Sequence, residues 1–320
     1  MIDNDERAVF VFDWTSREVT RIGRPGDGPG EYRSPAQLVA LSADSTLLTD
    51  GQTGKWFLMY RDRIITTLDR NQPLPRFVGA SPAGADNAGR MLVLHGSHFQ
   101  NVVGGVSGSG SINLADSLAV IVVDRHTSRP DTIARVRGPF LGATWVKARA
   151  GGMTVNYQLT NPLAAGDKAI LFPDGWIAIA IASPYHVAWL TPNSTIVRGR
   201  PLPHLKEPVD ERVKRLAIDE AWGTSPQAPK FRSTDFPPWP DVVPPFLREP
   251  LIALPDGRVA VKRTSLDPDS PIRYDIFDRR GSLSAVLRLP RNERLVGTGQ
   301  HSVYVAVTDS DQNEHLRRHP

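Results

Sequence analysis

Short strand-like segments separated by turn residues recur along this chain, and this repetition limits the possible fold more than any other feature. The clearest unit covers residues 37–68, where segments rich in apolar and β-branched residues occupy 38–41, 46–49, 56–60 and 64–68. Such residues favour strands, and the short turns between them join antiparallel neighbours. Each unit is therefore predicted to be a four-stranded antiparallel sheet.

A turn between the first and second strands marks the position of each unit. It carries Asp, Asn or Gly, which suit the positive φ of a tight hairpin, and it recurs near Asp44, Ala88, Asp174, Asp256 and Gly299. The steps between these markers are 44, 86, 82 and 43 residues. A period in the forties is typical of β-propellers. The two longer steps are interpreted as one unit plus an insertion.

These units predict an all-β chain: one β-propeller domain over residues 1–320, with six blades of four antiparallel strands. The blades are expected at about 8–22, 36–68, 76–136, 168–198, 250–288 and 294–319. One insertion is predicted to be helical near 207–222. Pro208 is placed at its start, Asp210 and Glu211 in its first turn, and one apolar stripe is formed by Val209, Val213, Leu216 and Ala217.

The first and last blades are expected to be incomplete. Asp50 lies six residues before Trp56 in the third strand of its blade, and Asp3 and Asp309 lie six residues before Val9 and His315. This register starts the first blade at the end of its second strand and ends the last blade in its third. We therefore expect further strands, and an export signal, upstream of Met1. An extracytoplasmic location (periplasmic, secreted or envelope-attached) follows from that expectation.

Composition excludes several kinds of site. The chain has no cysteine, so disulfides, thiolate metal sites and a cysteine nucleophile are excluded. Its formal net charge of +4 is small for 320 residues, and no run of five like charges occurs. We therefore do not expect nucleic-acid binding as the main function. No apolar segment approaches the roughly 18 residues of a membrane span.

Two segments resemble known propeller families. The sequence Gly-Pro-Gly-Glu-Tyr at 28–32, followed by Pro35 and the strand at Leu38, resembles the loop that leads into a blade of NHL repeats. Residues 244–261 resemble uncharacterised bacterial proteins of the six-bladed, TolB-like propeller class. The resemblance implies a propeller over nearly the whole chain. It also implies an envelope or secreted location, because such relatives are commonly found there. It implies little about chemistry, since this fold supports enzymes, receptors and scaffolds.

The placement of the insertions is the main indication of function. The long segments at about 95–117, 138–167 and 200–249 all belong to connections that emerge on one face of a propeller, whereas the turns on the opposite face are short. Long loops on a rigid scaffold commonly bind partners, and aromatic residues often anchor such contacts. The candidate binding residues on these insertions are Trp145, Tyr157, Trp222 and Trp239. The alternative is that they pack the insertions onto the blades.

Further candidates come from positions near strand starts. Glu31 and Tyr32 belong to the 28–32 loop, where Glu31 either lines the channel mouth or caps backbone N–H groups. Tyr185, beside His186, and the pair Arg248–Glu249 are candidates for the channel. His95 and His98 have a spacing that suits a metal on a helix, but their context is a strand followed by a glycine-rich loop, so no metal site is predicted from them.

The favoured function is a non-enzymatic scaffold that binds a peptide, protein or glycan on the face with the insertions. No Gly-x-Ser-x-Gly elbow, P-loop or His-Glu-x-x-His motif is present, and no cofactor is expected. One alternative is a lactonase-like hydrolase or lyase with a Ca²⁺- or Mg²⁺-type ion in the channel, for which the ligands to inspect are Glu31, Asn161, Asp174 and Glu249. A second alternative is NHL-like RNA binding through a basic face, with strongly salt-dependent affinity.

Overall fold

A computed structural model provides the fold of the chain. It describes residues 1–3, 6–13, 15–41, 44–68, 82–95, 112–113, 117–124, 127, 129–138, 142–150, 153–203, 206–223, 228–247, 250–299, 302–311 and 313–319. The chain divides into two compact units. The first consists of Met1–His95, Val120–Ala134 and Leu171–Trp176, and the second of Gly96–Ala119, Arg135–Ile170 and Ile177–Pro320.

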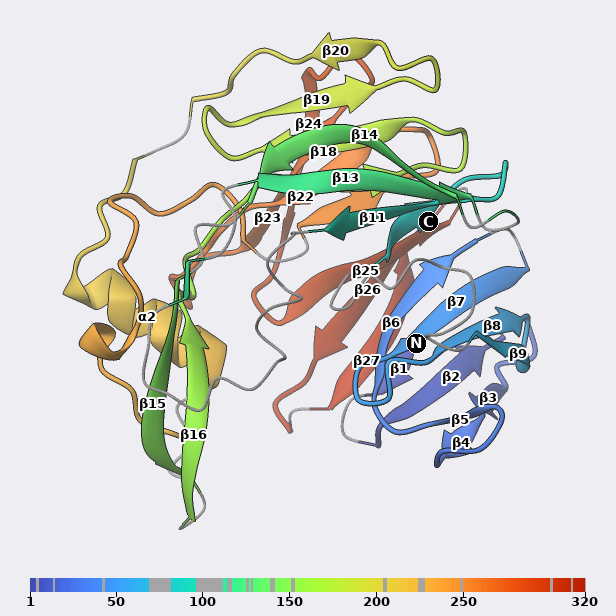
Figure 1. Ribbon diagram of the computed structural model, residues 1–320, viewed down its shortest axis with the longest axis horizontal. Helices are drawn as coiled ribbons and strands as arrows, with labels where there is room; N and C mark the ends of the chain where they lie inside the picture. Colours follow the sequence, from blue (N-terminus) through green and yellow to red (C-terminus); the bar gives the residue numbers. More distant parts are fainter. Residues whose placement is uncertain are drawn as a thin grey trace. The chain divides into compact units, whose positions relative to one another are not determined.

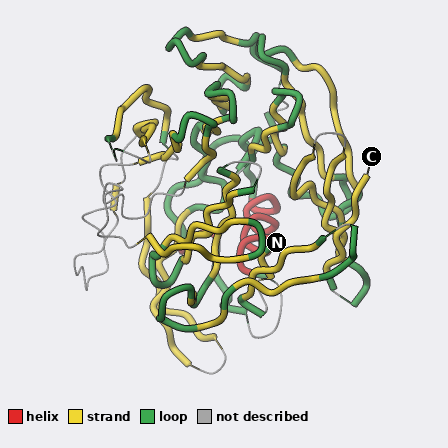
Figure 2. The backbone as a smooth tube through the Cα atoms, turned by 90° about the vertical axis from the view of Figure 1, so that its right-hand side faces the viewer, coloured by secondary structure: helices red, strands yellow, loops and turns green. Residues whose placement is uncertain are grey.

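The described residues are nearly all β-structure (Figure 1), as the repeated strand pattern predicts. Figure 2 shows strand along most of the described trace and helix over a single α segment. Pairing is overwhelmingly antiparallel and joins strands that follow one another in the chain. This order is expected, because short turns can only connect antiparallel neighbours.

The first unit contains three groups of consecutive strands and one short parallel pair. A three-stranded sheet has the order β1-β2-β3, a four-stranded sheet the order β6-β7-β8-β9, and β14-β13-β11-β10 pair in that order. The bounds are β1 Ile2–Asp3, β2 Ala8–Phe12, β3 Val19–Ile22, β4 Arg24–Pro25, β5 Glu31–Tyr32, β6 Pro35–Ala40, β7 Ser45–Asp50, β8 Trp56–Tyr60, β9 Arg63–Leu68, β10 Pro82–Ala85, β11 Arg90–His95, β13 Ser117–Asp124 and β14 Pro130–Arg137. The segments predicted as strands in 37–68 coincide with β6 to β9.

The second unit contains four groups. Strands pair in the orders β17-β18-β19-β20, β21-β22-β23-β24, β25-β26-β27 and β12-β15-β16. The bounds are β12 Ile112–Asn113, β15 Gly142–Ala150, β16 Met153–Thr160, β17 Lys168–Leu171, β18 Ile177–Ile181, β19 His186–Leu190, β20 Ile196–Arg198, β21 Leu251–Ala253, β22 Val259–Lys262, β23 Ile272–Phe277, β24 Leu283–Leu289, β25 Glu293–Gly299, β26 Ser302–Thr308 and β27 Glu314–His319. The helix α2 covers Glu211–Trp222 and a 3₁₀ turn, η1, covers Ser233–Asp235.

Local sequence signals account for the turns. Gly89, Gly175 and Gly257 have φ of +84°, +83° and +84°, the left-handed conformation predicted for the turn between first and second strands. Strand β7 ends in an aspartate, and another aspartate directly follows β26; both hold the next turn. Asp50 Oδ1 accepts from the backbone N–H of Gln52 and Thr53 at 2.8 and 2.9 Å. Asp309, which follows β26, likewise accepts through Oδ1 from the backbone N–H of Asp311 and Asn313, both at 2.9 Å.

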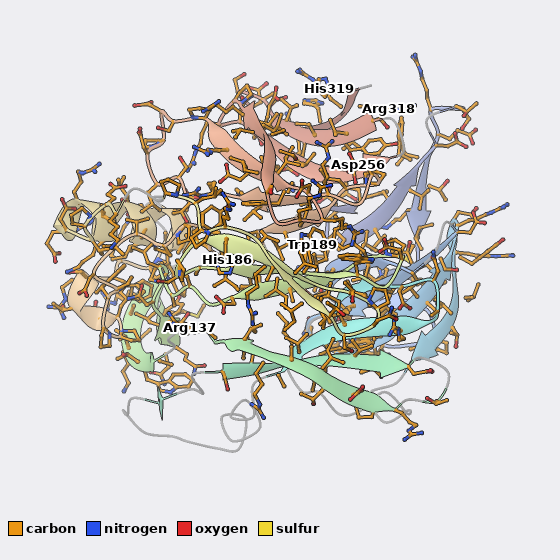
Figure 3. All side chains as sticks on the ribbon, turned by 90° about the horizontal axis from the view of Figure 1, so that it is seen from above. Arg137, His186, Trp189, Asp256, Arg318 and His319 are labelled. Atoms are coloured by element: carbon orange, nitrogen blue, oxygen red, sulfur yellow. The ribbon has the colours of Figure 1, made fainter. Side chains whose placement is uncertain are left out.

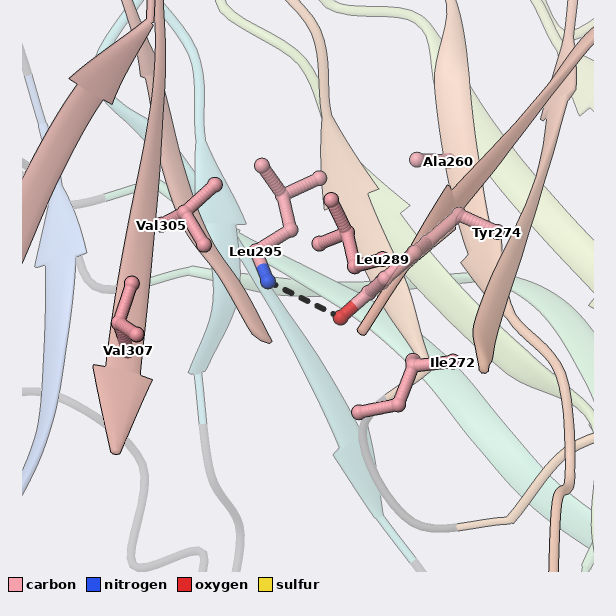
Figure 4. Close-up of a cluster of buried hydrophobic side chains, with 7 residues drawn as sticks. All are labelled: Ala260, Ile272, Tyr274, Leu289, Leu295, Val305 and Val307. Carbon is pink, nitrogen blue, oxygen red and sulfur yellow. Dashed lines mark hydrogen bonds between the residues drawn. The ribbon is translucent and has the colours of Figure 1, made fainter. Parts of the chain in front are cut away.

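Each unit has its own apolar core, formed by the alternate residues of its strands. In the first unit, Tyr32, Leu48 and Phe57 are fully buried together. In the second, a cluster draws residues from β22 to β26: Ala260, Ile272, Tyr274, Leu289, Leu295, Val305 and Val307 (Figure 4). The Tyr274 hydroxyl accepts a hydrogen bond from Leu295 N at 3.1 Å, so the polar end of this buried ring is satisfied.

The predicted helix near 207–222 exists but begins later than expected. Asp210 is its N-cap, with extended backbone and a side-chain oxygen that accepts from Val213 N at 2.8 Å, so Pro208 and Val209 precede the helix. Its buried residues are Val213, Ala217 and Ile218; Leu216 is only half-buried. The predicted stripe was therefore correct at Val213 and Ala217. Ile218 is buried in place of Leu216, and Val209 precedes the helix.

Candidate functional site

The insertion at 138–167, interpreted from sequence as a long connection, folds as a β-hairpin. Strands β15 and β16 pair antiparallel through eight residue pairs, from Ala143↔Thr160 to Ala150↔Met153. Apolar and polar residues alternate along both strands, which gives the ribbon two different faces. Figure 1 shows the two strands as a long ribbon beside α2.

One face of the hairpin packs into an aromatic cluster with α2 and the segment around η1. Tyr157 on β16 meets the Trp222 ring edge-on at a centroid distance of 5.8 Å and the Phe231 ring at 5.4 Å. Phe231 in turn contacts Trp222 at 4.9 Å and Phe236 at 6.0 Å, and Phe236 contacts Trp239 at 5.6 Å. Edge-to-face geometry of this kind is the favoured arrangement of aromatic rings.

Hydrogen bonds hold the parts of the insertion to one another. The Ser233 hydroxyl donates to Glu211 Oε2 at 2.8 Å, which ties η1 to the first turn of α2. The Trp239 indole N–H donates to Ser233 O at 2.9 Å, so the polar atom of this ring is also used internally. Asn161, which follows β16, donates from its amide to Pro238 O at 2.9 Å and is 4% exposed. The hairpin is therefore fixed to the helical segment at its base.

The tip of the same face is exposed. Beyond Tyr157, the side chains on this face are Val155 and Met153, which are 38% and 70% exposed, and the half-buried Ala148. Cross-strand pairing places Ala148 directly opposite Val155. Apolar side chains thus continue from the buried cluster to the exposed end of the ribbon.

The opposite face of the hairpin carries two cations. Lys147 and Arg149 alternate with the apolar residues of β15 and lie opposite Asn156 and Thr154. Both are exposed, and neither forms an ion pair with any residue that the structure describes. The stretch 142–160 has no acidic residue. The tip therefore combines an apolar face with an uncompensated positive face.

The structure brings together three of the four aromatic residues predicted on the insertions. Tyr157, Trp222 and Trp239 belong to one cluster. Trp145 lies on the other face of the ribbon, opposite Gln158, and its buried indole N–H has no partner among the described residues. The three clustered rings are half-buried and contact one another, so their main role here is to anchor the hairpin.

Tyr185 belongs to a separate buried polar group in the second unit. It directly precedes β19, the strand that contains His186 and Trp189 (Figure 3). Its hydroxyl donates to Asp275 Oδ2 at 3.1 Å, and the Arg263 guanidinium lies 4.4 Å from its ring centroid. Burial, followed by the charge of Asp275, raises the pKa of the Tyr185 hydroxyl well above its ordinary value. This hydroxyl is therefore a hydrogen-bond donor and not a base.

Asp275 is the centre of that group. It is 0% exposed and also accepts from Arg263 Nη1 and Arg273 Nε, both at 2.7 Å. Three donors occupy its two oxygens, which suits a buried carboxylate that stabilises packing between sheets. Sequence reasoning selected Tyr185 but missed these partners, because they are about 80 to 90 residues away in the chain.

Glu31 and Tyr32 have local roles in the first unit. Glu31 accepts from Gly28 N at 2.8 Å and from Arg24 Nε at 2.6 Å, and these two bonds lower the pKa of its carboxyl group. The Tyr32 hydroxyl donates to Ile22 O at 2.6 Å and accepts from Val9 N at 3.0 Å. The loop at 28–32 is thus held by the Gly28–Glu31 bond within it and by bonds to Val9, Ile22 and Arg24, which precede it in the chain.

The remaining candidates do not form a site in the described residues. Arg248, Glu249 and His98 lie outside them, as does the side chain of His95. His186 is 8% exposed, and its Nδ1 lies 2.7 Å from Pro184 O. Asp174 accepts from Trp176 N in its turn. Among the described side chains no group of three or more His, Asp or Glu residues could hold a metal ion. No described helix is long and apolar enough to cross a membrane.

Comparison with known proteins gives structural likeness only. No protein-family model matches the sequence, and no curated protein matches it. A Bacteroides fragilis protein described as exported aligns with a TM-score of 0.47 and 11% identity, over 96% of this chain and 75% of its own. A DUF4221 family member from Bacteroides vulgatus aligns with a TM-score of 0.42 and 6% identity, over 98% and 86%. A chain from a study of two prolyl endopeptidases aligns with a TM-score of 0.31 and 12% identity, over 88% and 49%. All three TM-scores are below 0.5, and these similarities carry no information about function.

Proposed function

We propose that this protein is a non-enzymatic scaffold that binds a peptide or protein partner through the hairpin β15–β16. The observation that supports it best is the exposed apolar tip of an anchored ribbon. Met153 and Val155 are 70% and 38% exposed, whereas the base of the same face is buried in the aromatic cluster. An apolar surface held out by a rigid base is typical of an interaction site.

A protein partner suits this tip better than a glycan does. Glycan sites usually present the open face of an aromatic ring, but Tyr157, Trp222 and Trp239 are engaged with one another and with Phe231 and Phe236. The exposed groups at the tip instead include one valine, one methionine and two cations. Methionine is adaptable in contact surfaces, and Arg is enriched at protein interfaces.

Site-specific crosslinking in the source organism tests this proposal. A photoreactive phenylalanine derivative is placed at Val155, and a matched control places it at Ile196, which lies on β20 in the same unit and is 51% exposed. We expect one dominant protein adduct from position 155 and none of the same identity from 196. The purified partner should then bind the Val155→Asp variant at least about tenfold more weakly than the unmodified chain.

Two results would contradict the proposal. Adducts of the same identity from both positions would indicate non-specific contact, and the absence of any adduct at 155 would remove the hairpin as a binding site. Circular dichroism of the Val155→Asp variant provides the folding control, because the change in a partly exposed strand should cost only about 1 kcal/mol of stability.

A further inference from the structure

From the hairpin geometry we infer that β16 is a docking edge for one extended peptide strand, with apolar and acidic residues in alternation. The inference rests on the proposed function and specifies its partner. It is carried by the position of β16 as the outermost described strand of its sheet, by the lack of charged residues and proline in its sequence, and by the charge of the neighbouring strand.

Strand β16 lies at the edge of the described part of its sheet. In the order β12-β15-β16 this strand is outermost, so among the described strands it pairs only with β15. Its four residues from Met153 to Asn156 are all exposed. An outermost strand presents a row of backbone N–H and C=O groups that another strand can pair with.

Natural proteins usually protect such edges with charged residues or proline. The other outermost strands of more than three residues in the described sheets follow this rule: Arg21 in β3, Pro35 in β6, Arg63 in β9, Pro130 in β14, Arg288 in β24, Arg294 in β25 and Arg317 in β27. Strand β16 reads Met-Thr-Val-Asn-Tyr-Gln-Leu-Thr and has neither. An unprotected edge on a strand that is otherwise well anchored indicates a pairing function.

The two faces of the ribbon define the side chains of the incoming strand. Residues directly opposite one another in an antiparallel pair share a face. Incoming residues beside Met153 and Val155 therefore extend the apolar face. Incoming residues beside Thr154 and Asn156 lie on the face of Lys147 and Arg149. Since strands are spaced by about 4.8 Å, the new strand lies about 10 Å from β15, within reach of these long cations and an acidic side chain.

The same charges argue against a second copy of the chain as the occupant. Pairing of β16 with its counterpart would place two lysines and two arginines on one face, and 142–160 provides no acidic residue to compensate them. An acidic strand instead neutralises Lys147 and Arg149, and main-chain hydrogen bonds supply the rest of the affinity, as in other cases of strand addition.

Binding of labelled nine-residue peptides to the full chain, followed by fluorescence anisotropy, tests the inference. The probe alternates valine and glutamate. One comparison peptide alternates valine and lysine, and another is the probe with N-methyl groups on alternate backbone amides. We expect the probe to bind, and both comparison peptides to bind at least about tenfold more weakly. The lysine peptide carries charge of the same sign as Lys147 and Arg149, and the N-methylated peptide lacks backbone N–H donors.

Matched charge reversals locate the site. The double variant Lys147→Glu/Arg149→Glu should weaken probe binding at least about tenfold. The control Arg317→Glu/Arg318→Glu makes the same change of charge on β27, another outermost strand of the second unit, and should leave binding unchanged. Both variants are checked for an unaltered circular dichroism spectrum and unfolding midpoint.

Four outcomes would overturn the inference: equal binding of the N-methylated peptide, equal loss of binding in the control variant, dimerisation of the chain through β16 in light scattering, or binding to phosphatidylserine vesicles in place of the peptide. If crosslinking at Val155 identifies a partner while the probe does not bind, the proposed function holds and the strand-addition inference fails. If neither gives a signal, both fail.

Discussion

At the scale of single residues, the buried carboxylate of Asp275 makes the clearest prediction about stability. Removing it leaves the Arg263 guanidinium, whose side chain is 13% exposed, and the Tyr185 hydroxyl without their common acceptor. Breaking a buried ion pair typically costs about 3–5 kcal/mol. We expect Asp275→Ala to lower the free energy of unfolding in urea by about that much. Tyr185→Phe removes one hydrogen bond and should cost about 1 kcal/mol.

The order of these two effects is the test. A Tyr185→Phe variant as unstable as Asp275→Ala would show that the hydroxyl, and not the ion pair, determines the stability of this group. An Asp275→Ala variant within about 1 kcal/mol of the unmodified chain would show that Arg263 and Arg273 reach water when the carboxylate is lost.

Asp50 predicts a dependence of stability on pH. Burial of this carboxyl group acts to raise its pKa, but backbone N–H donors led by Thr53 and Arg33 outweigh it, so the pKa is lowered on folding. A lowered folded pKa means that the ionised group stabilises the fold above the unfolded value, and that this contribution is lost as pH falls through the folded pKa. The unfolded value is about 4.

Unfolding free energies at a series of pH values should therefore separate the unmodified chain from Asp50→Asn. We expect the variant to be less stable at pH 7. Both carboxylate oxygens of Asp50 accept hydrogen bonds, whereas an asparagine amide has only one acceptor oxygen. The difference between the two proteins should shrink as pH falls below about 4. A difference that stays constant down to pH 2 would rule out ionisation of Asp50 as its source.

Two glycines with positive φ have different surroundings. Gly281 has φ +73°, and a Cβ there would lie 2.5 Å from Gly199 Cα. Gly223, the C-cap of α2, has φ +78° and ψ 166°, a region that essentially only glycine adopts, and nothing lies within 4 Å of such a Cβ. Backbone strain of this kind costs alanine about 1–3 kcal/mol. We expect Gly223→Ala to cost that amount, and Gly281→Ala to cost about 1–3 kcal/mol more because of the close contact. Equal losses in thermal unfolding would contradict the close contact.

At the scale of elements, the aromatic cluster determines whether the hairpin is presented at all. Phe231 contacts Tyr157 on β16, Trp222 on α2, and Phe236, so its ring joins three segments. We expect Phe231→Ala to destabilise the chain by about 3–5 kcal/mol through the cavity it leaves. Hydrogen exchange should then show lost protection in β15, β16 and α2, with little change in β25 to β27. Uniform loss over all strands would contradict this local role.

Sequence reasoning predicted some elements and missed others for identifiable reasons. Strands β6 to β9 and the glycines of the tight turns follow from local preference, so the sequence suffices for them. The hairpin was also accessible, because apolar and polar residues alternate over 144–150 and 153–159 around Gly151–Gly152. The interpretation of 138–167 as a long connection did not take this alternating pattern into account. The joining of Phe231 to Tyr157, 74 residues apart, depends on tertiary packing and has no local signature.

At the scale of the whole molecule, the repeat of about 43 residues continues to predict one six-bladed ring. Within each unit, most strands pair antiparallel with near neighbours in the chain, in groups of three or four. Blade number and ring closure remain predictions, because they depend on which first strands face a common axis. A repeat in the sequence specifies the unit, but the angle between neighbouring units is determined by packing between sheets.

Small-angle X-ray scattering tests this prediction directly. A single compact domain of 320 residues should have a radius of gyration of about 20 Å. Two independent bodies joined by the chain would give a larger radius and a second maximum in the distance distribution, because scattering pairs between separate bodies add long distances. We expect a single maximum and a radius near the compact value at low protein concentration. A radius of gyration well above the compact value, and unchanged on dilution, would contradict a single ring and indicate two separate domains.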